Sequence, residues 1–205
     1  MSATLEAAVR QKPCLPDEIT YERYLLELDT TAPEMRPYEI LDGVVNMVQT
    51  PNWRHQRIVL RIASLLHRYE EVSGNGFGGV APFDLVIQRK PKLRTRQPDV
   101  FVISSERLKQ NEVVLERGPL EVAPELVVEV LSPSETPRTL RAKLEDFRTA
   151  GVEECWVVAP TAETVQVLRL SAEGIETVHT YSFGEAVQSV VFSNLSMATA
   201  EIFAA

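Results

Sequence analysis

Residues 124–160, PELVVEVLSPSETPRTLRAKLEDFRTAGVEECWVVAP, decide the fold of this chain. The first part, 126–131, is apolar except for Glu129, which predicts a strand. Near the end, 155–158 is almost wholly apolar, as a buried central strand would be. The segment between them has helical periodicity, so the stretch predicts a strand, a helix and a second strand.

The predicted helix has recognisable ends and one apolar stripe. Thr136 can act as its N-cap with Pro137 at the first helical position, and Gly151 fits its C-terminal stop. Three apolar side chains recur at helical spacing: Leu140, Leu144 and Phe147. Lys143 lies on the same stripe and is therefore predicted to face the core.

Glu129 and Lys143 are both placed where a charge is costly. An ionised group that faces a core needs a partner or a metal ion. Structural alternatives stay open at this point. Glu129 could lie at an exposed strand end, since buried charges are rare. The stem of Lys143 could run along the core and leave its ammonium in solvent.

The rest of the chain alternates loosely between strands and helices. Asp42-Gly43 between apolar runs predicts a β-hairpin over 38–48. Helices are predicted over 52–72, 197–203 and 16–28, the last with the apolar face Ile19, Leu25, Leu26 and Leu28. Strands are predicted from the glycine-rich segment 73–79 through Phe83 and Ile87, and over 98–103, 164–170, 175–181 and 189–192. This order predicts a mixed central β-sheet flanked by helices, in the α/β (α+β) class.

Composition limits the class of protein. The 205 residues fit a single domain, predicted over 16–205, with 1–15 as a loosely attached N-terminal arm. The formal charge of −8 argues against general attachment to nucleic acid but leaves room for a local basic groove. Cys14 and Cys155 lie far apart, which indicates free thiols in a reducing compartment. No segment approaches a membrane span, so a cytoplasmic protein without a membrane partner is expected.

Two further carboxylates flank apolar runs in the same way as Glu129. Asp99 enters the strand predicted over 98–103, and Glu39 lies in the hairpin. Acidic side chains from neighbouring strands can converge on a hard cation such as Mg²⁺ or Mn²⁺. Such an ion activates water for hydrolysis of a phosphodiester, and a nearby lysine can stabilise the developing charge. A structural role is the simpler interpretation of each residue. Asp99 could cap a turn, and Glu39 could face solvent from the hairpin.

The order and spacing of these residues resemble those of a known protein family. Pro98-Asp99 followed by Glu129-Val130-Leu131 resembles the PD-(D/E)XK nuclease signature with its final lysine missing. Four segments together with the helix lysine resemble the Uma-two-type restriction-endonuclease-like family: YEILDGVVNMVQTPNWRHQ (38–56), PDVFVI (98–103), PELVVEVLSPS (124–134) and GVEECWVVAP (151–160). The resemblance implies a restriction-endonuclease-like domain with its catalytic core at about 38–160.

The resemblance also implies site residues. Asp99, Glu129 and the backbone carbonyl of Val130 would be metal ligands, with Glu39 as an additional acidic residue that holds a metal-bound water or a second ion. Lys143 would be the catalytic lysine, displaced onto the helix.

Other positions match the family less closely. Leu131 occupies the usual place of the lysine, and His55 matches a histidine that is common in the family without a settled role. Thr139 stands where members often carry an acidic residue, and Phe147 where they often carry tyrosine. The change at Thr139 predicts weaker support around the lysine.

Two functions from different classes follow. The first is a Mg²⁺- or Mn²⁺-dependent endonuclease that cleaves DNA through a metal-activated water, with a homodimer as an open alternative to a monomer. The second is a nuclease-fold protein that binds nucleic acid or a protein partner without cutting. The basic run RKPKLRTR (89–96) fits either phosphate contacts or a solvated hairpin.

Overall fold

The computed structural model describes residues 18–30, 38–111 and 119–204, and at its centre is a six-stranded mixed sheet. The strand order is β10-β9-β8-β7-β6-β3. Its members are β3 (Phe77–Val80), β6 (Val100–Ile103), β7 (Leu126–Val130), β8 (Glu154–Ala159), β9 (Thr164–Ser171) and β10 (Gly174–Tyr181). β7 and β8 are parallel, and the other neighbouring pairs are antiparallel. The predicted mixed sheet is confirmed.

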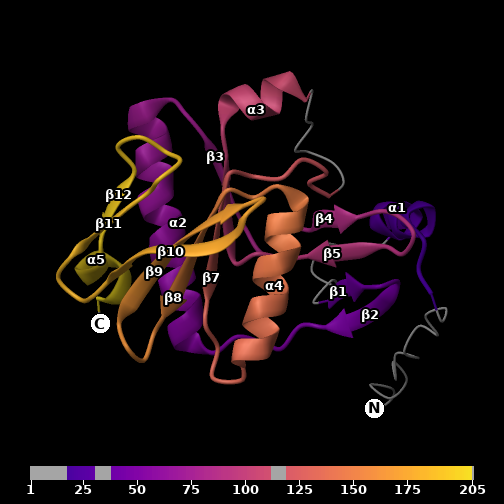
Figure 1. Ribbon diagram of the computed structural model, residues 1–205, viewed down its shortest axis with the longest axis horizontal. Helices are drawn as coiled ribbons and strands as arrows, with labels where there is room; N and C mark the ends of the chain where they lie inside the picture. The colour runs from indigo at the N-terminus through magenta and orange to yellow at the C-terminus, as the bar shows by residue number, and fades with distance from the viewer. Residues whose placement is uncertain (1–17, 31–37, 112–118, 205) are drawn as a thin grey trace, which may run out of the picture.

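Helices cover both faces of this sheet. Helix α4 (Pro137–Ala150) connects the parallel strands β7 and β8 and lies on one face, while α2 (Trp53–Ser73) lies on the other (Figure 1). Each face has its own apolar core, because successive side chains of a strand alternate between faces. Val128 and Val130 belong to the cluster that contains the α2 residues, and Val127 belongs to the cluster with Phe147 of α4.

Both helices have capped ends, and those of α4 are the ones that the sequence predicts. Asn52 caps α2 by accepting a hydrogen bond from the backbone N–H of His55, and Gly74 ends it with φ 63°. Thr136 caps α4 in a reciprocal capping box with Thr139, and Gly151 ends that helix with φ 99°. The left-handed backbone at both C-terminal ends favours glycine. These caps set where each helix begins, and so which side chains reach the end of the sheet.

Two small hairpins and a helix lie beside the main sheet (Figure 1). They are β1 (Tyr38–Leu41) with β2 (Val44–Met47), β4 (Leu85–Gln88) with β5 (Arg94–Arg96), and α1 (Tyr21–Thr30). Asp42 and Gly43 make the predicted turn with φ 55° and 80°, which fits a type I′ turn. The Gly43 N–H donates to the Leu93 carbonyl at 2.8 Å and so joins the two hairpins.

Three expectations about individual elements need correction. The first helix begins at Tyr21, and it is Tyr24, with Ile19 before the helix, that is buried, while Leu25 and Leu26 are exposed. The strand expected from the glycine-rich segment to residue 87 is two strands in different sheets, β3 and β4. The last predicted helix is shorter, α5 (Thr199–Phe203), and a short α3 (Ser105–Gln110) lies in the polar connection.

The strand predicted over 189–192 is also wrong. Short strands flank it instead, β11 (Ala186–Gln188) and β12 (Ser196–Ala198). The fully buried carboxylate of Glu154 accepts hydrogen bonds from the N–H groups of Val190 and Val191, both at 3.0 Å, and from the Ser189 hydroxyl at 2.7 Å. This carboxylate takes the place of a partner strand, so the segment turns around it.

The structure also bears on the predictions about the N-terminal arm, the cysteines and membrane spans. The N-terminal arm over 1–15, with Cys14, lies outside the described residues, whereas Cys155 is a buried free thiol in β8. None of the described helices has both the length and the apolar character needed to cross a membrane.

Candidate active site at the end of strand β7

The antiparallel register of β6 and β7 aligns the two predicted metal ligands. Val100 pairs with Val128 and Phe101 with Val127, so continuing the register by one residue sets Asp99 opposite Glu129. Asp99 Oδ2 accepts a hydrogen bond from the Val130 N–H at 2.7 Å. The two carboxylates therefore lie at the same end of the sheet, as the PD…E spacing predicts.

Glu129 faces α4 and meets Lys143. It follows Val127 by two residues and so points to the same face of β7, the one that α4 covers. Its side chain is 5% exposed. Lys143 Nζ donates a hydrogen bond to Glu129 Oε2 at 2.8 Å, and the lysine side chain is 23% exposed. The inward direction predicted for Lys143 is confirmed, and the alternative of a solvent-directed ammonium is excluded.

Burial and charge act in opposite directions on this pair. Burial raises the pKa of Glu129 to about 7, the charges of Asp99 and Glu39 add to the increase, and Lys143 opposes it. Burial would lower the pKa of Lys143, but Glu129 first and then Glu135 and Glu39 raise it above its usual value. The ammonium therefore stays charged, and burial makes the carboxylate of Glu129 harder to ionise than that of an exposed glutamate.

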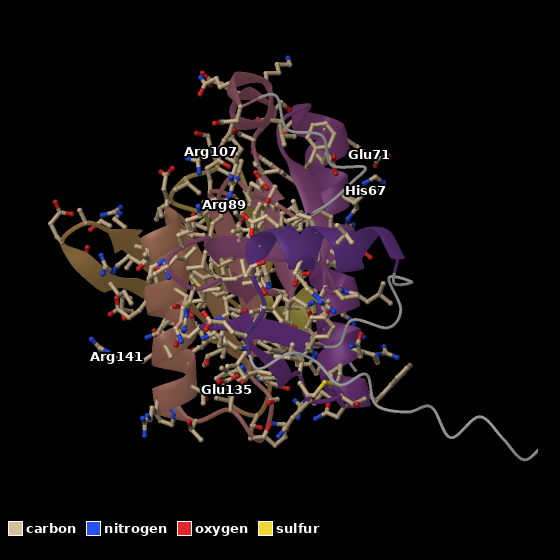
Figure 2. All side chains as sticks on the ribbon, turned by 90° about the vertical axis from the view of Figure 1, so that its right-hand side faces the viewer. His67, Glu71, Arg89, Arg107, Glu135 and Arg141 are labelled. Carbon is tan, nitrogen blue, oxygen red and sulfur yellow. The ribbon has the colours of Figure 1, made fainter. Side chains whose placement is uncertain are left out.

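Glu135 is a site residue that the sequence did not reveal. Its Oε2 lies 3.3 Å from Lys143 Nζ, and its Oε1 accepts a hydrogen bond from the Thr139 hydroxyl. Figure 2 places Glu135 near the N-terminal end of α4. Thr139 is expected from the sequence to weaken the support of Lys143. Glu135, four residues before Thr139, supplies the acidic partner instead, and the Thr139 hydroxyl holds it in place. The predicted N-cap at Thr136 was the one sequence feature that could have indicated that Glu135 lies at the start of α4.

His55 joins the site from the opposite face of the sheet. Its Nε2 lies 3.2 Å from Asp99 Oδ2, and its buried Nδ1 has no hydrogen-bond partner among the residues that the structure describes. Burial alone would lower the pKa of His55, but the hydrogen bond and charge of Asp99 and the charge of Glu129 raise it. The N-cap at Asn52 sets the start of α2 and so brings His55 to Asp99.

Glu39 is nearby but already has strong partners. Its Oε2 accepts a hydrogen bond from Arg96 Nη1 at 2.6 Å, and its Oε1 accepts one from the Gln97 N–H at 3.1 Å. Arg96 is itself buried and also donates to Asp146 of α4 at 2.7 Å. The reading of Glu39 as a solvent-facing residue is wrong. Its charge acts on Glu129 and Lys143, so it lies within electrostatic reach of them.

The basic run 89–96 is largely engaged within the protein. Arg94 Nε donates to Asp146 at 2.7 Å, Arg89 pairs with Glu121, and Lys92 lies 3.8 Å from Glu18. Together with the buried Arg96, these pairs balance much of the charge that made the run a candidate phosphate-binding segment. Arg94 and Arg96 connect β5 to Asp146 of α4. Neither interpretation of the run, as a phosphate-binding segment or as a solvated hairpin, describes these two arginines.

The oxygen atoms of the site suit a hard divalent ion. Glu129 Oε1 is buried and accepts no hydrogen bond from the described part of the chain, and Asp99 supplies a second carboxylate at the same strand end. Carboxylate and carbonyl oxygens are the ligands that Mg²⁺ and Mn²⁺ prefer. Within 18–30, 38–111 and 119–204, no three His, Cys, Asp or Glu side chains are grouped to hold a metal ion. The donors present thus fit an ion that keeps several waters rather than a closed cage of side chains.

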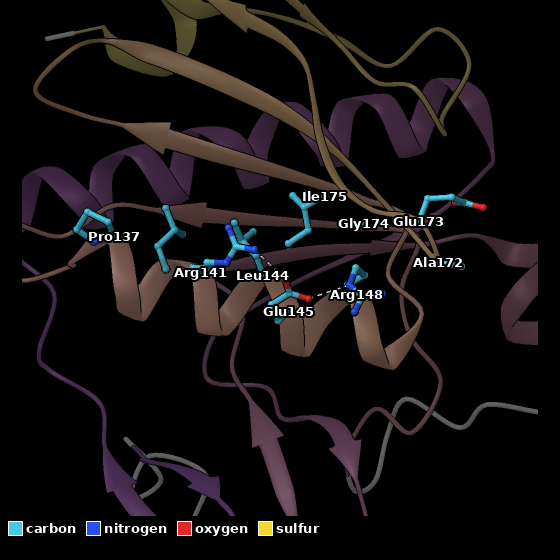
Figure 3. Close-up of a pocket in the computed structure, with 10 residues that line it drawn as sticks. Pro137, Arg141, Leu144, Glu145, Arg148, Ala172, Glu173, Gly174 and Ile175 are labelled. Atoms are coloured by element: carbon cyan, nitrogen blue, oxygen red, sulfur yellow. Dashed lines mark hydrogen bonds and ion pairs between the residues drawn. The ribbon is translucent and has the colours of Figure 1, made fainter.

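A large surface groove lies away from this site. It has a volume of about 630 Å³ and runs between α4 and the turn from β9 to β10 (Figure 3). Arg141, Glu145 and Arg148 line it, and Glu145 pairs with both arginines. None of the predicted site residues lines the groove, so its size carries no argument about the chemistry.

Comparisons with known proteins identify the family and the fold of the chain. The model of the Uma2 family, described as "putative restriction endonuclease", matches residues 21–200. A solved structure from Anabaena variabilis, titled as a "putative nuclease belonging to DUF820", is similar with a TM-score of 0.69 and 18% identity. The similarity covers 90% of this chain and 97% of that one, and at this identity it shows the fold alone. No curated protein matches the sequence. With a family match over most of its length and a restriction-endonuclease-like sheet, the chain belongs to the Uma2 family.

Proposed function

We propose that this protein is a metal-dependent endonuclease that hydrolyses DNA phosphodiester bonds at the end of β7. One observation carries the proposal. Lys143, on helix α4, donates to Glu129 of β7, and Asp99, the residue before β6, accepts a hydrogen bond from the N–H of the next residue, Val130. Two acidic groups and one cation from three elements thus meet at one strand end, where a structural design would place apolar residues. Membership of a family described as restriction endonucleases supports nucleic acid as the substrate.

Asp99, Glu129 and the Val130 carbonyl would hold a Mg²⁺ or Mn²⁺ ion. When bound there, the ion would lower the pKa of a water molecule and offset charge on a phosphate oxygen. Glu39 would hold a metal-bound water or a second ion. Each of its oxygens keeps a further lone pair beyond the hydrogen bonds from Arg96 and Gln97, so it can still accept a hydrogen bond from water.

Lys143 would stabilise the phosphate as negative charge develops on it. Its ammonium keeps its proton because Glu129 and Glu135 both raise its pKa. A fixed cation costs little reorganisation during the reaction, which is the basis of electrostatic catalysis. His55 would hold the Asp99 carboxylate in position from the α2 side, at 3.2 Å.

Cleavage of supercoiled plasmid DNA in Mg²⁺ or Mn²⁺ tests the proposal. Wild-type protein should nick the plasmid, and Asp99→Asn and Lys143→Met should each abolish nicking. Arg141→Met, on the exposed side of the same helix, should nick like the wild type. Nicking that persists in both Asp99→Asn and Lys143→Met would contradict the assignment.

A second function has its own supporting observation. Glu129 and Lys143 already neutralise one another, and the net charge is −8, so the protein could bind nucleic acid or a partner without cutting. Calorimetry with Mn²⁺ separates the two functions. Absence of Mn²⁺ binding by correctly folded protein would favour the second function over the first.

A further inference from the structure

Trp53 is a large aromatic side chain on the surface of an otherwise well-packed helix. It is the first residue of α2 and is 74% exposed. The guanidinium of Arg57, one turn later, lies over its ring at 5.6 Å from the centroid. A cation in this position holds an indole in one orientation. Most of the ring surface nevertheless faces solvent, so the indole is available for contact with a flat ligand.

The surroundings of Trp53 are basic although the protein as a whole is acidic. Arg54, Arg57 and Arg61 lie with Trp53 along a hollow of about 450 Å³ between α2 and α5. One acidic residue lines the same hollow, Glu163, whose pair with Arg54 has a separation of 3.3 Å. An exposed pair of this kind is weak and easily exchanged for another anion. Among the described residues that line the hollow, the charged side chains are thus mostly basic, and Arg61 also donates to the Ala204 carbonyl; this basic character suits a polyanionic strand.

This surface begins at the same end of the sheet as the candidate active site. Trp53 and His55 are two residues apart, so they lie about 3 Å apart along the axis of α2, though on opposite sides of it. Glu163 lies in the turn after β8, and β8 runs parallel to β7, with the Leu131 N–H donating to the Val158 carbonyl at 2.9 Å. A strand of nucleic acid that reaches Asp99 can therefore continue over the end of α2.

We propose that Trp53 stacks on an unpaired base of a DNA strand, with the arginines of the α2 surface facing its phosphates. This inference rests on the proposed function, because it assigns the substrate that the site would act on. Every base has a face that can stack on an indole, but in a duplex those faces are covered by neighbouring base pairs. The substrate class is therefore DNA with an unpaired stretch, such as a single strand, a flap or a frayed end.

Tryptophan fluorescence tests this proposal directly. The chain has two tryptophans, and Trp156 is 0% exposed, so a base that stacks on the protein surface can quench Trp53 alone. The titration uses a single-stranded oligodeoxynucleotide and its blunt duplex, in EDTA so that cleavage does not occur. Quenching by the single strand, and little by the duplex, is the expected result.

Variants at both ends of α2 complete the test. Trp53→Ala should weaken single-strand binding by about 5- to 100-fold, the usual effect of removing one stacking platform. Trp53→Phe should restore part of the affinity because it keeps a ring. Val72→Ala, an exposed apolar residue near the other end of α2, should bind like the wild type.

The outcomes also separate this inference from the proposed function. Plasmid nicking without single-strand quenching, or equal loss of single-strand and duplex affinity in Trp53→Ala, would overturn the stacking proposal and leave the nuclease standing. Quenching without nicking would support the stacking surface and contradict the nuclease. Concentration-dependent self-association that Trp53→Ala abolishes, with no quenching by either oligonucleotide, would assign this surface to a second copy of the chain and also overturn the proposal.

Discussion

Lys143 Nζ lies 2.8 Å from Glu129 Oε2, and this contact joins helix α4 to strand β7 across fourteen positions of sequence. In the PD-(D/E)XK signature the lysine follows the glutamate on the same strand. Here Leu131 occupies that position and packs with the apolar cluster on the α4 face. The cation that faces Glu129 instead comes from the helix that covers this face, and we propose that it takes the role of the signature's lysine.

Replacing Lys143 should affect stability in a pH-dependent way. Lys143→Met removes the cation that faces Glu129 but keeps an apolar stem. At pH 8 the carboxylate would remain buried without its partner, which costs about 3–5 kcal/mol. At pH 5 protonation of Glu129, whose pKa is already raised to about 7, would remove most of that penalty. Urea unfolding at the two pH values measures the difference.

Arg141→Met is the matched control for this lysine. It lies on the exposed side of α4, with a loose pair to Glu145 at 3.6 Å. Its loss should change the free energy of unfolding by less than about 1 kcal/mol at either pH. If Lys143→Met lost the same stability at pH 5 as at pH 8, the lysine would act through packing of its stem and not through its charge.

Glu129 should make the wild-type protein less stable as the pH rises. Its pKa in the folded protein, about 7, is above the ordinary value of 4.5, because burial disfavours the charged form. The folded state therefore holds this proton more tightly, and stability from this group is present below pH 4.5 and lost as the pH rises through 7. The loss amounts to about 3 kcal/mol.

Denaturant unfolding between pH 4 and pH 8 measures this contribution. Glu129→Gln should remove it and give a flatter profile than the wild type. Glu71→Gln, on the exposed surface of α2, should keep the wild-type profile. A profile for Glu129→Gln that runs parallel to the wild type would mean that Glu129 is ionised as easily in the folded as in the unfolded chain.

Arg96 should be more important for stability than other arginines of its hairpin. It is buried between Glu39 of β1 and Asp146 of α4, at 2.6 and 2.7 Å. Arg96→Met would leave two buried carboxylates with one partner fewer and should cost about 3–5 kcal/mol. Arg89→Met breaks an exposed pair with Glu121 and should cost at most about 1 kcal/mol. Thermal unfolding of the two variants checks this, and equal losses would rule out a special role for Arg96.

Much of the site could be predicted because it depends on local periodicity. The alternation of side chains along β7 and the antiparallel pairing of neighbouring strands bring Asp99 opposite Glu129. The apolar stripe of α4 turns Lys143 toward the same strand. The caps at Thr136 and Gly151 are also local, and they fix the start and end of that helix.

The contacts that could not be predicted join distant parts of the chain. Glu39 and Arg96 are 57 positions apart, and nothing in either segment names the other as its partner. Glu154 precedes the apolar run 155–158 and carried no prediction of its own, yet its carboxylate organises the segment after β11. Glu135 escaped notice because its role depends on where the turn before α4 places it. Single-sequence patterns describe elements, whereas these pairs arise only when the elements pack.

The central claim is that Asp99 and Glu129 hold one divalent ion, and titration of the protein with Mn²⁺ by calorimetry tests it most directly. The wild type should bind one Mn²⁺, and Asp99→Asn should bind it at least about tenfold more weakly, since a charged ligand is lost. Asp42→Asn, in the exposed turn between β1 and β2, should bind like the wild type. A wild-type protein that binds no Mn²⁺, or an Asp99→Asn variant that binds it equally well, would contradict the claim.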